Sequence, residues 1–159
     1  MRASNTKGGG MRSQKTTHDQ AFLSKHYEEA RCEMAKFLKT FRDAEQIWLG
    51  LDDPGMRRKV FRLISKELVD SKHFNMGVTI FEPGERCQMH NHPGSEEIDF
   101  ILKGRALAID AQGNETILEA NDVMFIPEGE YHQHVSIGDE PLWLLWVYTP
   151  QAELPPAKA

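Results

Sequence analysis

The chain has 159 residues, a length that suits one domain and is short for two. Its 19 Lys and Arg residues against 24 Asp and Glu residues give a net charge of -5, which argues against a nucleic-acid-binding surface. Its apolar stretches are far shorter than the ~20 residues of a membrane-spanning helix, and its polar start lacks the apolar segment of a signal peptide. We therefore expect a cytoplasmic protein with no membrane or nucleic-acid partner.

The N-terminal third is expected to hold an arm and one helix. Residues 1–17 are polar and glycine-rich, which predicts a disordered arm that is dispensable for folding. Residues 18–45 carry apolar side chains at steps of three and four, which predicts an α-helix packing on the rest of the domain. The stripe consists of Leu23, Tyr27, Ala30, Met34, Phe37 and Phe41. It is too short for a dimeric coiled coil.

After a turn at 52–55, the pattern changes to short strands separated by residues that favour turns. The predicted strands are Arg58–Ser65, His73–Phe81, Arg86–His92, Glu97–Leu102, Arg105–Asp110, Glu115–Leu118, Val123–Ile126, Tyr131–Val135 and Leu142–Tyr148. This regular spacing predicts an all-β sandwich or barrel at residues 46–150, followed by a tail at 151–159. The basic run Arg57-Arg58-Lys59 is interpreted as a solvated strand end rather than as a binding patch.

Four of the seven histidines form two pairs, His90/His92 and His132/His134. Strand alternation puts both imidazoles of a pair on the same side of the sheet. Two histidines on one face, shortly before a pair of glutamates, are better explained as metal ligands than as structural residues. Imidazole and carboxylate ligands suit Fe(II), Mn(II), Ni(II), Co(II) or Zn(II), with positions left open for water or substrate.

The spacing around the first histidine pair resembles the first motif of the cupin family. That motif is Gly, five residues, His-x-His, three or four residues, Glu, six residues and Gly. This chain has the same residue types at the same spacing, namely Gly84, His90-Asn91-His92, Glu97 and Gly104. All five fixed positions agree over a short segment, so the resemblance is specific.

The second cupin motif is also recognisable. It reads Gly, five residues, Pro-x-Gly, two residues, His, three residues and Asn, and the matching residues here are Asn121, Pro127-Glu128-Gly129, His132 and Ser136. Asn121 replaces a glycine and Ser136 replaces an asparagine, which affects only the turn geometry. Asparagine tolerates a positive φ better than most residues, so Asn121 is expected to make the same turn.

The resemblance implies a double-stranded β-helix, or jelly-roll barrel, and one divalent metal ion per chain. The implied ligands are His90, His92, Glu97 and His132, with Fe(II) or Mn(II) favoured. The choice of Glu97 over Glu96 depends on the six residues before Gly104. Strand alternation alone places Glu96 on the more apolar face of its strand and would favour Glu96 as the inward-facing residue. Both faces of a sheet can be covered, however, so Glu97 can still face the ligand cavity.

Further candidates flank the implied ligands. Asp99 shares a face with Glu97 and is a candidate general acid or base, with a hydrogen-bonded structural carboxylate as the alternative. His134 is a candidate proton shuttle or fifth ligand, and a role beside the ligands or at the rim is favoured. Continued alternation from His90 turns Arg86 and Gln88 toward the cavity for substrate binding, Arg86 as a carboxylate clamp or in a surface ion pair.

The functional expectation follows from the resemblance. It implies a mononuclear metal-dependent enzyme that acts on a small polar or acidic molecule, and three histidines with one carboxylate slightly favour a dioxygenase. A redox-neutral isomerase, lyase or cyclase and a non-catalytic binding or sensing cupin are the alternatives. Small cupins resemble one another in pairing their sheets, so we expect a homodimer.

Overall fold

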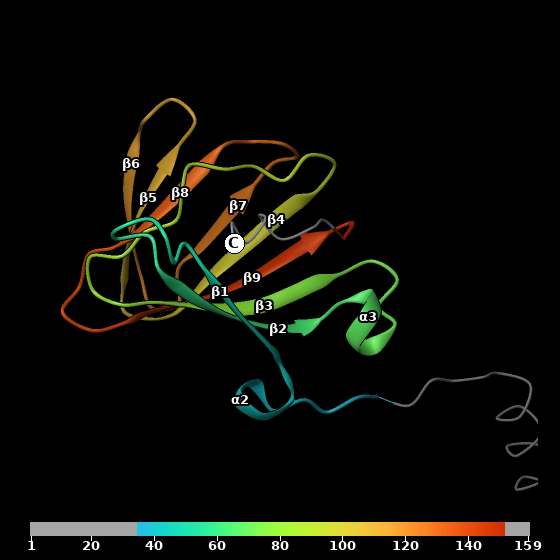
Figure 1. Ribbon diagram of the computed structural model, residues 1–159. Coiled ribbons are helices and arrows are strands. Elements are labelled where there is room, and N and C mark those ends of the chain that lie inside the picture. The colour runs from blue at the N-terminus through green and yellow to red at the C-terminus, as the bar shows by residue number, and fades with distance from the viewer. Residues whose placement is uncertain (1–34, 152–159) are drawn as a thin grey trace, which may run out of the picture. The chain divides into compact units, whose positions relative to one another are not determined.

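The computed structural model describes residues 35–151, which form strands with two single-turn helices (Figure 1). The helices are α2 (Thr40–Asp43) and α3 (Lys66–Val69). The strands are β1 (Glu45–Leu49), β2 (Arg58–Ile64), β3 (Asn75–Phe81), β4 (Glu96–Lys103), β5 (Arg105–Asp110), β6 (Glu115–Glu119), β7 (Val123–Ile126), β8 (His132–Ser136) and β9 (Leu142–Thr149). No helix among the described residues is long and apolar enough to cross a membrane.

Every predicted strand but one is present, with ends within about two residues of the prediction. The exception is the segment 86–92, which forms only isolated bridges, from Arg86 to Val135 and from His90 to His132. A bend at Met89 interrupts it. The prediction of a continuous strand here is therefore wrong.

The predicted helix at 18–45 differs from the structure where the two can be compared. The arm at 1–17, the helix as far as residue 34 and residues 152–159 of the tail lie outside the described residues. Residues 35–39 are not helical, α2 is a single turn, and β1 begins at Glu45 inside the predicted helix. β1 pairs with β2 along its whole length, so sheet hydrogen bonding overrides the local helical spacing.

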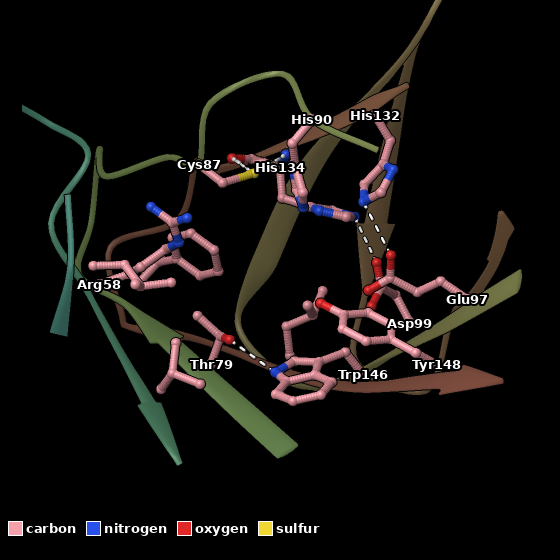
Figure 2. A pocket seen from close by; sticks show the side chains of 14 residues that line it. Arg58, Thr79, Cys87, His90, Glu97, Asp99, His132, His134, Trp146 and Tyr148 are labelled. Carbon is pink, nitrogen blue, oxygen red and sulfur yellow. Dashed lines mark hydrogen bonds and ion pairs between the residues drawn. The ribbon is translucent and has the colours of Figure 1, made fainter. Parts of the chain in front are cut away.

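Two antiparallel sheets form the domain, as the all-β prediction requires. The larger sheet has the strand order β1-β2-β3-β9-β4-β7, and the smaller has the order β6-β5-β8. The segment that carries His90 runs along the free edge of β8 and extends the smaller sheet. The two sheets enclose a small cavity of about 40 Å³, whose lining is drawn in Figure 2.

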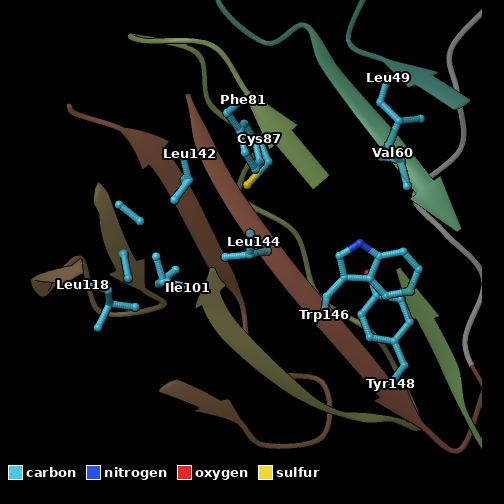
Figure 3. Packing of buried hydrophobic residues seen from close by; sticks show 12 residues of the cluster. Leu49, Val60, Phe81, Cys87, Ile101, Leu118, Leu142, Leu144, Trp146 and Tyr148 are labelled. Carbon is cyan, nitrogen blue, oxygen red and sulfur yellow. The ribbon is translucent and has the colours of Figure 1, made fainter. Parts of the chain in front are cut away.

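Strand alternation divides the space between the sheets into an apolar part and a polar part. Side chains from both sheets fill the apolar part, among them Ile101, Leu142, Leu144, Ala106 and Leu118 (Figure 3). The same face of β4 passes from Ile101 through Asp99 to Glu97, and all three are at most 3% exposed. One strand face therefore leads from the apolar core into the candidate site.

Two turns hold the strands that carry this site. Asn121 has a φ of 79°, and its backbone N–H donates to the carbonyl of Ile101, as its expected role in place of a glycine requires. Gly104 follows β4 with a φ of 80°, and a Cβ there would lie 2.8 Å from the carbonyl oxygen of Pro141. Only glycine fits this close approach of backbone.

Candidate metal centre

Three histidines and one glutamate meet at the polar end of the barrel. His90 and His92 come from the segment between β3 and β4, Glu97 from β4, and His132 from the start of β8. His90 and His132 exchange two backbone hydrogen bonds of 3.0 and 2.8 Å, which place their rings 4.3 Å apart. Figure 2 shows both imidazoles directed toward the Glu97 side of the cavity.

The donor atoms are close enough to bind one ion. The Oε2 atom of Glu97 lies 3.1 Å from Nε2 of His132 and 3.3 Å from Nε2 of His92. One ring nitrogen from each of His90, His92 and His132 lies within 4.8 Å of the others. A transition metal bonds such donors at roughly 2.0–2.2 Å, so its ligands lie about 3–4.4 Å apart.

Hydrogen bonds orient two of the imidazoles. Nδ1 of His90 lies 2.9 Å from the carbonyl oxygen of Gln88, and Nδ1 of His132 lies 3.2 Å from that of Glu130. A carbonyl oxygen only accepts, so Nδ1 carries the hydrogen in both rings. Nε2 of each ring is then left with a free lone pair, which is the form that binds metal.

Burial keeps the histidines neutral. Burial, together with the neighbouring His132, lowers the pKa of His90 to about 3 and that of His92 to about 4. Burial also lowers the pKa of His132, whereas it raises the pKa of Glu97 to about 8. Nε2 of His92 and Oε2 of Glu97 are buried without a hydrogen-bond partner among the described residues. Lone pairs that face one another in this way fit a cation.

A second buried pair lies beside this centre. Oδ2 of Asp99 is 3.3 Å from Nε2 of His134, and these atoms group with His132 in a second set of donors within 4.8 Å of one another. Burial, and then the charge of Glu97, raises the pKa of Asp99 well above its usual range. Burial lowers the pKa of His134 to about 3. His134 is therefore uncharged near neutral pH without metal, and burial favours the protonated form of Asp99.

Three named relatives are similar to this chain in sequence. The polyketide synthase CurC from Streptomyces cyaneus is 36% identical over 80 residues, which are 50% of this chain and 51% of CurC. The oxalate-binding protein from Thermotoga maritima is 33% identical over 85 residues, 54% of this chain and 69% of that protein. Gentisate 1,2 dioxygenase 1 from Aquipseudomonas alcaligenes is 27% identical over 110 residues, 69% of this chain and 28% of the enzyme. The chain thus spans about half of CurC and about a quarter of the dioxygenase.

The family model for the cupin domain matches residues 77–148, a range that contains both histidine pairs and Glu97. The chain belongs to the cupin family. A solved structure, titled as a predicted oxalate decarboxylase from Thermotoga maritima, matches with a TM-score of 0.63 and 26% identity. The match covers 73% of this chain and 100% of the other, so the two sheets form the expected cupin jelly roll.

Two predicted substrate-binding residues of this cupin do not line the cavity. Arg86 is half-buried beside Gly55, and Gln88 is exposed and donates from Nε2 to Asp53. The bend at Met89 changes the alternation, so Cys87 and His90, three residues apart, both line the cavity. The expectation that Arg86 and Gln88 face inward is therefore wrong.

The cupin cavity contains a basic residue that the sequence interpretation missed. Arg58, the first residue of β2, lines the cavity and is only 8% exposed, so it does not belong to a solvated strand end. Arg57 beside it is exposed and lies over the ring of Trp48. Arg58 lies two residues before the buried Val60, so strand alternation puts both side chains on the same face. Apolar residues occur on both faces of β2, however, and the sequence alone did not show which face points inward.

Proposed function

We propose that this cupin is a mononuclear metal-dependent enzyme that acts on a small polar or acidic molecule. The observation that carries the proposal is that ring nitrogens of the neutral His90, His92 and His132 lie within 4.8 Å of one another, while Oε2 of Glu97 lies 3.1 Å from His132 and 3.3 Å from His92. These four residues would hold the ion. Fe(II) or Mn(II) is the proposed ion, and Ni(II), Co(II) or Zn(II) are the alternatives that the same ligands suit.

A bound ion would supply Lewis-acid chemistry or, as Fe(II), redox chemistry with O₂. The dioxygenase proposal is supported by the similarity to a relative named as a gentisate dioxygenase. The similarity to CurC, named as a polyketide synthase, favours a redox-neutral reaction as the alternative. In either case, the barrel wall excludes bulk water, and the protein must move any proton that the reaction requires.

We assign that proton transfer to Asp99 and His134. Both side chains line the cavity, and each is at most 2% exposed. Asp99 in its protonated form would give its single proton to an atom in the cavity, and neutral His134, with Nε2 3.3 Å from Oδ2 of Asp99, would serve as the base that passes a proton back to the carboxylate. Replacing Asp99→Asn keeps the shape and removes the acid, so turnover should fall by roughly 10²–10⁴-fold with metal content unchanged. Equal turnover would exclude Asp99 from the mechanism.

Metal analysis of protein purified without added metal tests the centre itself. We expect one divalent ion per chain, lost in the variant His90→Ala/His132→Ala. His73→Ala is the matched control, because His73 is an exposed histidine outside the site and its removal should leave the metal content unchanged. Full occupancy in the double variant would overturn the ligand assignment.

A non-catalytic cupin that binds a small molecule is the second candidate. It is supported by the 33% identity to a relative named as an oxalate-binding protein. A binding protein would be stabilised by its ligand according to mass action. A ligand that raises the melting temperature without any turnover, in the wild type and in Asp99→Asn alike, would favour this function.

We also propose a homodimer formed through the outer face of the larger sheet. Ile98 and Leu102 on β4, and Val123 and Phe125 on β7, are 42–56% exposed there. Ile98 lies opposite Phe125 in the β4–β7 ladder, so these side chains are neighbours on one apolar surface. A second copy of this chain is the proposed occupant, and a stable dimer would bury ~1,200–2,000 Å².

A further inference from the structure

Arg58 is a buried cation with few partners. Among residues 35–151 its guanidinium group makes one hydrogen bond, from Nη1 to the carbonyl oxygen of Met56 at 3.1 Å, although it has five N–H donors. No carboxylate of residues 35–151 lies within ion-pair distance of it. The remaining donors therefore have no anionic partner in this part of the chain.

The ionisable groups nearest to Arg58 do not balance its charge. They are the thiol of Cys87 and the phenol of Tyr148. Burial raises the pKa of Cys87 to about 11 and that of Tyr148 well above its usual range, so both are neutral near pH 7. A guanidinium group remains charged in proteins, and burying it without an anion is unfavourable.

Arg58 and the proposed metal ligands enter the cavity from different strands. In the sheet order, β3 and β9 separate β2, which carries Arg58, from β4, which carries Glu97. Figure 2 shows Arg58 on one side of the cavity, with Glu97 and Asp99 on the other. A molecule between them can meet the guanidinium group at one end and the proposed metal centre at the other.

We propose that Arg58 is an anion-binding site that holds the carboxylate of a short acid with a second polar group. The inference rests on the proposed function, since the second group would reach the metal centre. The guanidinium group can donate two parallel hydrogen bonds to the two oxygens of a carboxylate. The negative charge of that carboxylate would balance the charge of Arg58. The cavity of about 40 Å³ favours a molecule of few heavy atoms.

Calorimetric titration with oxalate, malonate and glycolate tests this site. We expect the metal-loaded wild type to bind at least one of them, and the metal-free wild type to bind it more weakly. For a malonate complex, the uncharged malonamide should fail to bind. Arg58→Met should lower the affinity for the bound acid by about tenfold or more in both forms, since a charged hydrogen bond is lost.

Arg86→Met is the matched control, because it also removes one arginine but from a position that does not line the cavity. It should bind the acid as the wild type does. Arg58→Lys keeps the charge and loses the fork, so its affinity should lie between those of the wild type and Arg58→Met. If Arg58→Met fails to fold, this lysine variant and a shift of the Arg58 side-chain N–H resonance in the wild type decide the question.

The outcomes separate this proposal from the proposed function. Unchanged acid affinity in a folded Arg58 variant, an unshifted Arg58 resonance, or no binding of any of the three acids by the wild type would overturn the anion site. Absence of metal, together with acid binding that still depends on Arg58, would overturn the metalloenzyme and leave the anion site supported.

Discussion

At the scale of single residues, two adjacent glutamates have opposite surroundings. Glu97 is 3% exposed and faces the three histidines, whereas Glu96 on the other face of β4 is exposed. Burial raises the pKa of Glu97 to about 8 in the metal-free protein. One step along the strand therefore separates an exposed carboxyl group from a buried one, and burial favours the protonated form of the buried Glu97.

This difference predicts a pH dependence of the metal-free protein. Folded Glu97 stays protonated up to about pH 8 while the unfolded chain ionises near its ordinary pKa, so unfolding releases a proton. The contribution of Glu97 to stability is thus full below about pH 4.5 and is lost as the pH rises through 8. As the pH rises, the unfolding equilibrium constant of the wild type should therefore increase relative to that of Glu97→Gln, by up to about tenfold for each pH unit.

Urea unfolding in the presence of a chelator, repeated between about pH 5 and pH 8, measures this effect. Glu96→Gln is the control and should follow the wild type, because it changes the exposed neighbour. Parallel stability curves for the wild type and Glu97→Gln would contradict the prediction.

Residue-level reasoning from the sequence succeeds where alternation is regular and fails where it is not. The two-residue steps on β4 and β8 correctly predict that Glu97 and Asp99 share one face and that His132 and His134 share another. The positions around Met89 could not be predicted, because a bend depends on the pairing of this segment with β8 rather than on its own side chains.

At the scale of elements, β3 and β9 depend on a glycine opposite a tryptophan. Gly77 faces Trp146 across the ladder, and a Cβ at this position would lie 2.5 Å from the indole ring and 2.6 Å from the carbonyl oxygen of Phe61. The indole Nε1 donates to Oγ1 of Thr79 at 3.0 Å, which fixes the ring at the cavity wall. The absence of a side chain on β3 thus makes room for the ring on β9.

Gly77→Ala should therefore destabilise the fold by at least about 1–3 kcal/mol, because the backbone contact cannot relax easily. Gly138→Ala is the control, since a Cβ there meets nothing closer than 3.8 Å, and its effect should stay within about 0.5 kcal/mol. Thermal unfolding of both variants measures the difference. Equal melting temperatures for the two variants would show that β3 and β9 have room to adjust.

The element scale also explains why residues 35–45 do not continue the predicted helix. Phe41 belongs to the apolar stripe, but its ring packs against Phe61 and Trp143 from the single turn α2. Glu45–Leu49 then pairs with β2. A sequence pattern identifies side chains that need burial, whereas the partner strand that provides hydrogen bonds is known only from the fold.

At the scale of the whole molecule, the proposed dimer has a direct test. Ile98→Lys places a charge at the centre of the apolar surface and should shift sedimentation of the protein at micromolar concentration from dimer to monomer. Ile117→Lys is the matched control, because Ile117 is 51% exposed on β6 in the smaller sheet. A wild type that sediments as a monomer, or a dimer that both variants retain, would contradict the proposal.

The bend at Met89 has a consequence for redesign of the pocket. A mutant library built on strict alternation would randomise residues 86 and 88, and these side chains lie outside the cavity. The bend brings Cys87 into the lining instead, on the same wall as His90 and within the electrostatic reach of Arg58. Substitutions at 87, unlike those at 86 and 88, would therefore change the size and polarity of the cavity while leaving every proposed ligand intact.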